Sequence, residues 1–393
     1  MRILILSFYY PPDLGPGSLR AKSLLDALLD YSKDPIHVDV VTTMPNRYHS
    51  FSSDTLELEV YKSAFIHRFS LTAHHNNLIG QSKAFVLFAW RAIKFTKNKK
   101  YNLVLATSGR LMTATLGALI SKRCNAKLYL DIRDLFTDHI KNVLNFFLLK
   151  IFIPILTIIE KWTFCSADKI NVVSGGFIEH MKRVAPSQSI SIYTNGVDQE
   201  TIDYNFVNTK INSLPLILYA GTIGASQGLH YLFSSLDDSW KKKAQFLFVG
   251  DGSKRQKLQE LINDKLWTNF EIINPEPRNQ LYIRYQQADV LFLHLNDYDS
   301  LHKVLPSKIF EYAASGKPIL AGVEGYAAKF LKEEVLGVEI FKPGDVFAMQ
   351  IGLQKLLKGP KIINRKNFNL RYLRKNITQN MAKNILALAK NIK

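Results

Sequence analysis

The sequence predicts an α/β protein made of two doubly wound domains that face each other across a cleft. Short apolar runs rich in β-branched residues alternate with longer segments of helical periodicity along the whole chain. These runs are continuously apolar, which is typical of parallel strands covered by helices on both faces. With 393 residues, 47% of them hydrophobic, the chain has enough apolar material for two cores.

The first half of the chain contains six of these predicted strands. They are Ile3–Leu6, Val38–Val41, Leu103–Ala106, Leu128–Leu130, Ile170–Val173 and Ile190–Ile192. Segments with helical periodicity lie between them, the clearest being Leu19–Leu29 and Thr113–Arg123. Strand and helix therefore alternate from the first residues onward, as in a doubly wound sheet.

The same rhythm returns in the second half. Its predicted strands are Leu216–Tyr219, Phe246–Val249, Phe270–Ile273, Val290–Leu293, Pro318–Leu320 and Val338–Phe341. A turn sequence at Thr194–Asp198, followed by a polar stretch to Pro215, marks the boundary between the two series. In open parallel sheets ligands bind beyond the carboxyl ends of the strands, so two such domains predict a substrate cleft.

Composition narrows the class of protein. Two isolated cysteines, Cys124 and Cys165, indicate a reducing compartment and provide no zinc pattern. The longest apolar stretch, Val143–Ile159, is interrupted by polar residues and a proline and falls short of the roughly 20 residues of a membrane span. The formal net charge of +18 favours anionic partners such as nucleic acid, anionic lipid or phosphorylated substrates.

The first strand is followed by a glycine-containing loop that leads into a helix. Gly15 and Gly17 allow backbone amides to approach a ligand, and the start of a helix favours anions. The order of strand, loop and helix favours a phosphate-facing role, although a plain tight turn has a similar sequence. Arg20 is a candidate phosphate partner or, alternatively, a solvated helix residue.

Two further strands end in glycine-containing loops. Ala220–Leu229 repeats the first arrangement in the second domain. Val249–Arg255 follows another strand and places Lys254 and Arg255 at the start of the next helix. Many α/β turns contain glycine, so each signal is weak alone, but three of them in one chain favour binding of a phosphorylated ligand.

The most specific segment is Val304–Leu320. Pro306 and Ser307 begin a helix that Gly316 ends just before a strand. Glu311 is a single acid in an otherwise apolar helix, and a carboxylate can accept two hydrogen bonds from a vicinal diol such as ribose. The alternative is a surface glutamate paired with a nearby lysine.

Together these segments resemble glycosyltransferase family 4, the group 1 transferases of the GT-B fold with two Rossmann-like domains. The opening loop and Asp131–Phe136 are most similar to bacterial transferases of O-antigen and capsule assembly, some of the fucosamine type. The resemblance implies that Glu311 binds the nucleotide ribose and that Gly15 and Gly17 approach the transferred sugar and its phosphates. It also implies that the last helix returns to the first domain, which gives domains 1–195 plus 372–393 and 196–371.

Several positions depart from the family pattern. Lys303 stands where the family has a second glutamate, Thr222 and Gln227 where it has an Arg and a Lys that hold the pyrophosphate, and Arg133 where it has a histidine. The leaving diphosphate still needs positive charge, so other cations must replace those that are missing. The candidates are Lys303, Lys308, Lys254 and Arg255, with Lys308 and Arg255 preferred.

The resemblance also implies a retaining reaction that needs no metal. The acceptor hydroxyl attacks on the face from which the diphosphate leaves, and a phosphate oxygen helps to take its proton. Asp134 is a candidate for orienting the acceptor or acting as base, or alternatively for a structural ion pair with Arg133. The nucleotide sugar is a substrate, and no cofactor is expected.

A membrane surface is the expected partner of the first domain. The segments Phe85–Lys100 and Lys141–Trp162 mix aromatic residues with cations, as in helices that lie in the lipid interface, and core helices are the alternative. Family acceptors are often lipid-linked glycans. The sequence therefore predicts a cytoplasmic enzyme bound peripherally to the inner face of the cell membrane.

Three other functions fit less of the sequence. A nucleotide-sugar 2-epimerase shares the two-domain architecture and needs no acceptor. A catalytically inactive relative is consistent with the displaced cations. Binding of nucleic acid is disfavoured, because the chain has no zinc-finger spacing, RNP-like segment or long basic run.

Overall fold

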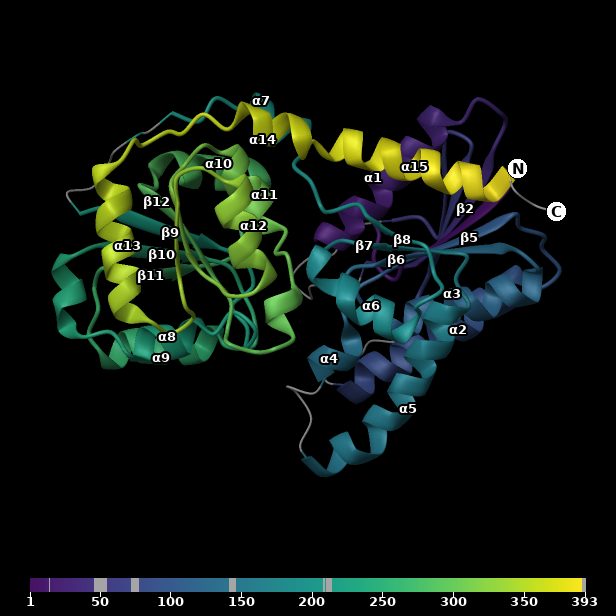
Figure 1. Ribbon diagram of the computed structural model, residues 1–393, viewed down its shortest axis with the longest axis horizontal. Helices are drawn as coiled ribbons and strands as arrows, with labels where there is room; N and C mark the ends of the chain where they lie inside the picture. The colour runs from purple at the N-terminus through teal and green to yellow at the C-terminus, as the bar shows by residue number, and fades with distance from the viewer. Residues whose placement is uncertain are drawn as a thin grey trace. The chain divides into compact units, whose positions relative to one another are not determined.

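The computed structural model describes residues 1–13, 15–45, 55–71, 78–140, 146–207, 209 and 214–390. The chain forms two compact units (Figure 1): unit 1 contains Met1–Asn195 and Arg374–Lys393, and unit 2 contains Gly196–Leu373. Each unit has its own sheet, and the predicted α/β class with two largely parallel, Rossmann-like sheets is confirmed. The cleft expected between the domains stays a prediction.

Unit 1 is built on an eight-stranded sheet with the order β3-β4-β2-β1-β5-β6-β7-β8. Its strands are β1 (Arg2–Leu6), β2 (His37–Thr43), β3 (Leu58–Tyr61), β4 (Ala64–Phe69), β5 (Leu103–Ser108), β6 (Lys127–Ile132), β7 (Lys169–Val172) and β8 (Ile190–Ile192). All neighbours pair in parallel except β3 and β4. The six strands predicted in this half are therefore confirmed.

The hairpin of β3 and β4 at the sheet edge was not predicted. Residues of β4 alternate between buried and half-buried, and those of β3 are half-buried or exposed. The continuous apolar run that identifies the other strands is therefore absent. An edge strand exposed on one face needs no such run.

Helices cover both faces of this sheet. They are α1 (Pro16–Tyr31), α2 (Leu78–Thr96), α3 (Leu111–Cys124), α4 (Phe136–Ile140), α5 (Phe146–Cys165), α6 (Ile178–Val184) and α15 (Arg374–Lys390), with a 3₁₀ turn η1 (Gly175–Phe177). Buried apolar residues of α1 and α15 share one core with β1, β2 and β5, whereas α2 and α5 both contact α3. The final helix thus belongs to unit 1, and it begins two residues after the predicted Tyr372.

Unit 2 contains a six-stranded, fully parallel sheet with the order β11-β10-β9-β12-β13-β14. Its strands are β9 (Leu216–Ala220), β10 (Gln245–Val249), β11 (Phe270–Ile273), β12 (Val290–His294), β13 (Ile319–Gly322) and β14 (Val338–Phe341). All six were predicted as continuously apolar runs, and they are confirmed.

The helices of unit 2 also cover both faces of its sheet. They are α7 (Gln199–Asp203), α8 (Leu229–Ser234), α9 (Arg255–Asp264), α10 (Arg278–Gln287), α11 (Lys308–Ala314), α12 (Tyr326–Glu334), α13 (Val346–Lys358) and α14 (Lys366–Arg371), with 3₁₀ turns η2 (Asp238–Lys242) and η3 (Leu301–Lys303). Aromatic side chains including Phe233, Phe246 and Phe292 fill the core beneath α8, α9 and α13.

The strand order places one loop of each unit where a ligand is expected. Chain connections diverge to opposite sides at β1, which lies between β2 and β5, and at β9, which lies between β10 and β12. Ligands of doubly wound sheets bind at the carboxyl ends of the strands beside this reversal. The loops that follow β1 and β9 are two of the three glycine loops found in the sequence.

Candidate functional site

The loop after β9 is bonded along its length to the loop after β10. Gly221 donates its backbone N–H to Val249 O at 3.0 Å, and Ile223 donates to Asp251 O at 2.9 Å. The backbone N–H of Lys254 donates in turn to Ile223 O at 2.9 Å. The two glycine loops of unit 2 therefore form one paired surface at the carboxyl edge of its sheet.

Close backbone packing explains the glycines of this surface. A Cβ on Gly250 would overlap the carbonyl oxygen of Gly221, and one on Gly252 would lie within 3 Å of the backbone of Ile223. Backbone atoms cannot move aside as the end of a long side chain can. Glycine is thus required here by loop-to-loop packing, whether or not a phosphate binds.

The two predicted donor residues of this loop lie differently. Thr222 is exposed, and its carbonyl accepts a hydrogen bond from Tyr219 Oη at 2.6 Å. The Gln227 side chain turns back on the loop, where Oε1 accepts from Gly224 N at 3.2 Å. Neither residue brings a charge to the loop.

Among the described residues, two buried nitrogen atoms in the first turns of the helices that follow the paired loops have no hydrogen-bond partner. They are Nε of Arg255, at the start of α9, and Nε2 of His230, in the first turn of α8. Burial and the charges of Lys257 and Lys254 lower the pKa of His230, so its imidazole is neutral. A buried polar atom without a partner costs about 1–3 kcal/mol, which a ligand oxygen would recover.

Glu311 lies in a three-residue cluster that also contains Lys308 and Tyr285. Lys308 Nζ is 3.1 Å from Glu311 Oε2 and 3.3 Å from Tyr285 Oη, and Tyr285 Oη donates to Glu311 Oε1 at 3.1 Å. The side chains of Lys308 and Glu311 are 27% and 18% exposed. The lysine partner of the simpler interpretation is present, but this glutamate is mostly buried rather than on the surface.

The charge state of Glu311 follows from these contacts. Burial raises the pKa of its carboxyl, but the charge and hydrogen bond of Lys308, the charge of Arg278 and the hydrogen bond from Tyr285 outweigh burial. The net pKa is lowered, so Glu311 is a carboxylate at neutral pH. It retains lone pairs that a ligand hydroxyl can use.

The neighbouring Tyr312 fixes α11 to the sheet. Its hydroxyl accepts from Ala220 N at 2.9 Å and donates to Ala220 O at 3.3 Å, at the carboxyl end of β9. Gly316, at φ 71°, ends the helix as predicted. The helix that carries Lys308 and Glu311 is therefore held at the same sheet edge as the glycine loops.

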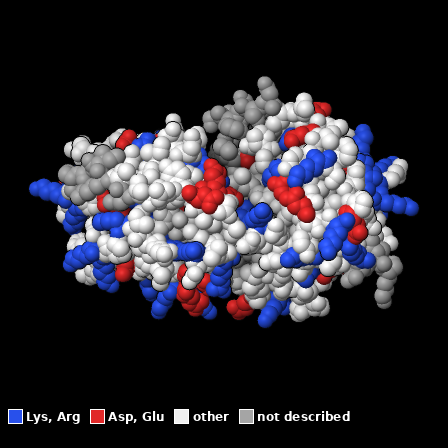
Figure 2. All heavy atoms as spheres, turned by 90° about the horizontal axis from the view of Figure 1, so that it is seen from above, with Lys and Arg blue, Asp and Glu red and all other residues white. Residues whose placement is uncertain are grey.

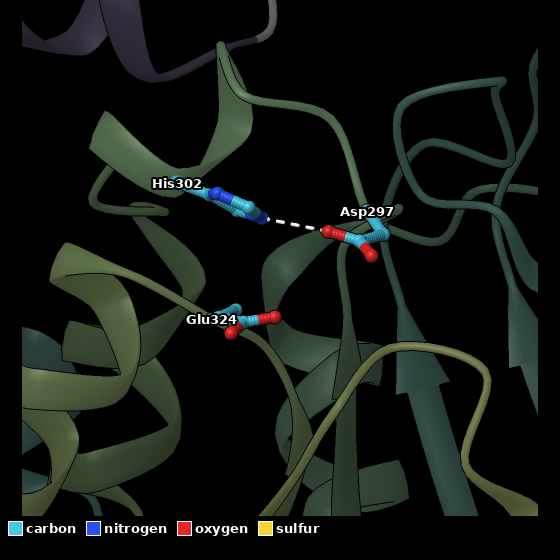
Figure 3. Close-up of side chains that lie close together, drawn as sticks. All are labelled: Asp297, His302 and Glu324. Carbon is cyan, nitrogen blue, oxygen red and sulfur yellow. Dashed lines mark hydrogen bonds and ion pairs between the residues drawn. The ribbon is translucent and has the colours of Figure 1, made fainter.

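Lys303 ends the turn η3, next to a cluster that could hold a metal ion. Asp297, His302 and Glu324 each offer a ligand atom within 4.8 Å of the others, and Figure 3 shows their side chains directed toward one space. His302 Nε2 is 2.8 Å from Asp297 Oδ1. No local pattern in the sequence marks this group, because Glu324 lies in a different segment, after β13, from Asp297 and His302, which lie between β12 and α11.

The predicted residues of unit 1 meet at the start of α1. A Cβ on Gly17 would overlap the guanidinium of Arg133, and one on Gly109, which follows β5, would lie 3.3 Å from its Nη2. Gly15 precedes the helix at φ 154°. Asp134 is half-buried and follows Arg133 between β6 and α4. Gly17 thus makes room for Arg133, which the sequence did not reveal.

Neither role considered for Arg20 is supported. Its side chain is 2% exposed, so it is not a solvated helix residue. Nε and Nη2 donate to the two oxygens of Asp131 at 2.8 and 2.9 Å, while Nη1 and Nη2 donate to Thr194 O and Tyr193 O, both at 2.8 Å. Because protein acceptors already engage this buried guanidinium, the geometry favours a structural role over the predicted phosphate contact.

A separate cavity of about 360 Å³ lies elsewhere in unit 2. Its lining comes from α7, the chain after it, the end of α11 and α14, and includes Tyr204, Phe206 and Leu370. None of the predicted site residues lines it, and its walls are largely apolar. We therefore assign the candidate site to the carboxyl edge of the sheet and not to this cavity.

One family model matches the second half of the chain. Residues 201–374, nearly the whole of unit 2, match the model of the family described as glycosyl transferases group 1. No curated protein matches the chain in sequence. The family match covers the loop after β9, the paired loop after β10 and α11.

Solved structures resemble the chain over its full length. Sucrose-phosphate synthase from Thermosynechococcus elongatus is 16% identical with a TM-score of 0.69, and the match covers 99% of this chain and 96% of that one. HepE from Anabaena in complex with UDP-glucose is 15% identical with a TM-score of 0.66, covering 98% and 100%. WaaG, a glycosyltransferase involved in lipopolysaccharide biosynthesis, is 12% identical with a TM-score of 0.63, covering 99% and 97%. At these identities the likeness shows the fold.

Proposed function

We propose that this chain is a glycosyl transferase of group 1 that moves a sugar from a UDP-sugar to a membrane-linked glycan acceptor with retention of anomeric configuration. The observation that carries the proposal is the mostly buried carboxylate of Glu311, fixed beside the paired glycine loops in the segment that matches the family. The structure of HepE in complex with UDP-glucose supports the choice of nucleotide. An N-acetylated amino sugar and surface polysaccharide such as O-antigen or capsule are the substrate and pathway we propose.

Unit 2 would hold the donor through three kinds of contact. Glu311 would accept hydrogen bonds from the two ribose hydroxyls, while Lys308 keeps it ionised. Arg255 and His230 would donate to the diphosphate, which would satisfy their buried nitrogen atoms. Lys303 and Lys308 would add positive charge as the diphosphate leaves, the stage at which stabilisation accelerates the reaction most.

Unit 1 would contribute Arg133 and Asp134. The guanidinium of Arg133 lies against Gly17 at the start of α1, where backbone amides also favour negative charge. Arg133 would thus bind the phosphates or orient the acceptor, and Asp134 would orient the attacking hydroxyl. The resemblance implies that this chemical step needs no metal.

The donor site is tested by UDP affinity. We expect Glu311→Ala to weaken UDP binding by about 10- to 100-fold, since a hydrogen bond to a charged group contributes about 1.5–3 kcal/mol. Glu333→Ala, at an exposed position on α12, is the matched control and should leave the affinity unchanged. Isothermal titration calorimetry measures both. Equal affinity in Glu311→Ala and the wild type would remove the proposed ribose contact.

Product analysis tests the reaction itself. A transferase should form glycosylated product only with a glycan acceptor present, and the acceptor should raise UDP release above the slow rate of donor hydrolysis. Conversion of the nucleotide sugar into its 2-epimer without any acceptor would instead establish the epimerase alternative. Binding of UDP without either conversion would favour a catalytically inactive relative.

The acceptor partner we propose is carried by an anionic membrane that contacts unit 1. Along α5 the side chains of Phe152, Ile155, Ile158 and Trp162 form one exposed apolar stripe, with Ile158 70% exposed. On α2, Trp90 is 58% exposed. Residues 141–145 and the side chains of residues 146–151 of this predicted lipid-facing segment lie outside the described structure.

The net positive charge of the chain also favours an anionic membrane as the partner. The net charge is +18, and Lys and Arg side chains are spread over much of the face in Figure 2. Within the described ranges no helix is long and apolar enough to cross a membrane. We therefore propose peripheral binding at the cytoplasmic face, with the apolar stripe in the lipid interface and the cations at the headgroups.

Vesicle binding tests this partner. Ile158→Glu should reduce cosedimentation with phosphatidylglycerol vesicles by about tenfold, because it replaces an apolar side chain worth roughly 1.5–3 kcal/mol on burial with a charge. Ile351→Glu, at an exposed position on α13 of unit 2, is the control of the same residue type. Equal loss in both variants, or none in either, would contradict a specific lipid-facing stripe on α5.

A further inference from the structure

The carboxyl edge of the unit 2 sheet carries a second chemical group besides the Glu311 cluster. Asp297 follows β12, His302 lies in η3 and Glu324 follows β13. One ligand atom from each lies within 4.8 Å of the other two (Figure 3), and the imidazole already faces the carboxylate of Asp297 at 2.8 Å. Side chains from two segments, the connection between β12 and α11 and the loop after β13, thus converge on one space.

We propose that Asp297, His302 and Glu324 bind a divalent cation of the Mn²⁺ or Zn²⁺ class beside the donor diphosphate. The position beside the diphosphate rests on the proposed donor role of unit 2. Carboxylate oxygens suit Mn²⁺ and imidazole nitrogen suits Zn²⁺, whereas Mg²⁺ and Ca²⁺ prefer oxygen alone. Three protein ligands leave at least one coordination position for water or a phosphate oxygen.

The geometry allows the group to close around an ion. Ligand atoms of a tetrahedral Zn²⁺ site lie roughly 3.3–3.6 Å apart, given bonds of about 2.0–2.2 Å. The Asp297 and Glu324 side chains are 62% and 38% exposed, so small rotations meet little packing resistance. The hydrogen bond between His302 and Asp297 would give way to a shared cation.

The cluster lies next to the loop that we propose holds the diphosphate. Asn296, immediately before Asp297, donates its backbone N–H to Ser226 O at 2.8 Å and its side-chain Nδ2 to Ala225 O at 3.2 Å. That loop, residues 221–228, contains no Lys or Arg. A cation at the cluster would supply positive charge beside it, where charges on a diphosphate need compensation.

Lys342 is one positive charge that opposes an ion at this position. Its Nζ is 3.9 Å from Glu324, and its side chain is 79% exposed. An exposed ammonium can swing into solvent at little cost. Lys342→Ala should therefore tighten cation binding, whereas a cluster with no affinity for metal would not respond.

Mn²⁺ titration of the UDP-free, full-length protein tests the site directly. We expect saturable binding that weakens at least tenfold in His302→Ala, since loss of even an outer partner of a metal ligand typically lowers metal affinity about 10- to 100-fold. His37→Ala is the matched control, since His37 also faces a carboxylate, Asp39 at 3.5 Å, but lies in unit 1. Absence of saturable binding in the wild type, or equal binding in His302→Ala, would overturn the proposal.

Coupling between Mn²⁺ binding and UDP binding tests whether the cation lies beside the diphosphate. Saturating Mn²⁺ should raise UDP affinity about tenfold, and UDP should raise Mn²⁺ affinity by the same factor, because linkage is reciprocal. His302→Ala with UDP and Mn²⁺ measures the background from ions bound to free UDP. Chelation should raise the donor KM and leave kcat at saturating donor unchanged, which agrees with a metal-free chemical step.

The two proposals fail in different ways. UDP that binds to the wild type with no saturable Mn²⁺ site would remove the cation and leave the donor site intact. A Mn²⁺ site that His302→Ala removes, in a protein that binds no UDP, would leave the cation and remove the donor role. A Mn²⁺ site without coupling to UDP would contradict its position beside the diphosphate.

Discussion

The two units hold their central carboxylates in opposite ways. In unit 1, Asp131 is fully buried and accepts from Arg20 twice, from Thr107 Oγ1 at 2.7 Å and from Asn171 Nδ2 at 2.8 Å. In unit 2, Glu311 has bonds from Lys308 and Tyr285, and its side chain is 18% exposed. The first pair is saturated by the protein, whereas the second retains capacity for another partner.

This difference distinguishes charged residues that stabilise the fold from charged residues that can bind a ligand. Arg20 also binds Tyr193 O and Thr194 O, the end of the first segment of unit 1, so its charge joins α1, β6 and the chain that leaves β8. The Lys308 and Glu311 pair lies within one short helix and joins only α10 to α11. A buried charged side chain whose hydrogen bonds all go to distant segments of the protein stabilises the fold. A charged side chain with unused hydrogen-bonding capacity can bind a ligand.

Breaking the saturated pair should give the largest effect. Arg20→Met leaves Asp131 as a buried, uncompensated carboxylate, and we expect it to reduce the free energy of unfolding by about 3–5 kcal/mol. Denaturant unfolding monitored by circular dichroism measures this loss. Lys22→Met, on the same helix and in a half-buried pair with Asp26 that water still reaches, should cost no more than about 1 kcal/mol.

The double variant Arg20→Met with Asp131→Leu sharpens this test. Replacing both members of a buried pair by apolar residues removes the uncompensated charge, so this protein should be more stable than Arg20→Met alone. Equal destabilisation in the single and double variants would show that Arg20 acts through its packing or its carbonyl contacts rather than through Asp131.

The sequence predicted the sheets better than the site for a physical reason. Twelve strands were predicted correctly because each is a continuous apolar run, and Glu311 became a candidate because a single acid stands out in an apolar helix. The partner of Arg20 lies 111 residues away, so no local pattern distinguished a buried arginine from a solvated one. His230 was missed likewise, because only the packed loops around it leave its nitrogen without a partner.

Glycines of the two units should respond differently to the same substitution. In unit 2, Gly250→Ala puts a methyl group against the Gly221 carbonyl, which cannot move freely, and should cost about 1–3 kcal/mol of stability. In unit 1, Gly17→Ala meets the end of the flexible Arg133 side chain, which can rotate away. We expect little change in stability there but about a tenfold loss of transferase activity, as a 1.4 kcal/mol change in barrier implies.

Introducing Gly17→Ala into an Arg133→Ala protein distinguishes displacement of Arg133 from a general effect of the methyl group. If Gly17→Ala acts by moving this guanidinium, it should cause almost no further loss of activity in an Arg133→Ala protein. Gly359→Ala, where the new Cβ meets only ordinary contacts at 3.5 Å, is the control for substitution itself. Additive losses in the double variant would mean that Gly17 serves the ligand directly.

The smallest effect we expect concerns acid stability, and it probes the open pair. Because the folded-state pKa of Glu311 is lowered below its ordinary value, unfolding at acidic pH takes up a proton there. The stabilisation is fully present above the ordinary glutamate pKa and is lost as the pH falls through the folded-state value. Glu311→Gln should thus flatten the acid limb of the stability curve by about 1 kcal/mol between neutral and acidic pH.

Tryptophan fluorescence can assign this change to the right unit. Of the four tryptophans, Trp240 and Trp267 in unit 2 are 1% and 3% exposed, whereas Trp90 and Trp162 in unit 1 are 58% and 36% exposed. The red shift on unfolding therefore reports mainly unit 2. Asp131 also has a lowered pKa, but its loss at acidic pH should appear in circular dichroism and not in this shift. An unchanged fluorescence acid limb in Glu311→Gln would mean that Lys308 does not stabilise the ionised glutamate, and the contrast between a saturated and an open pair would then rest on burial alone.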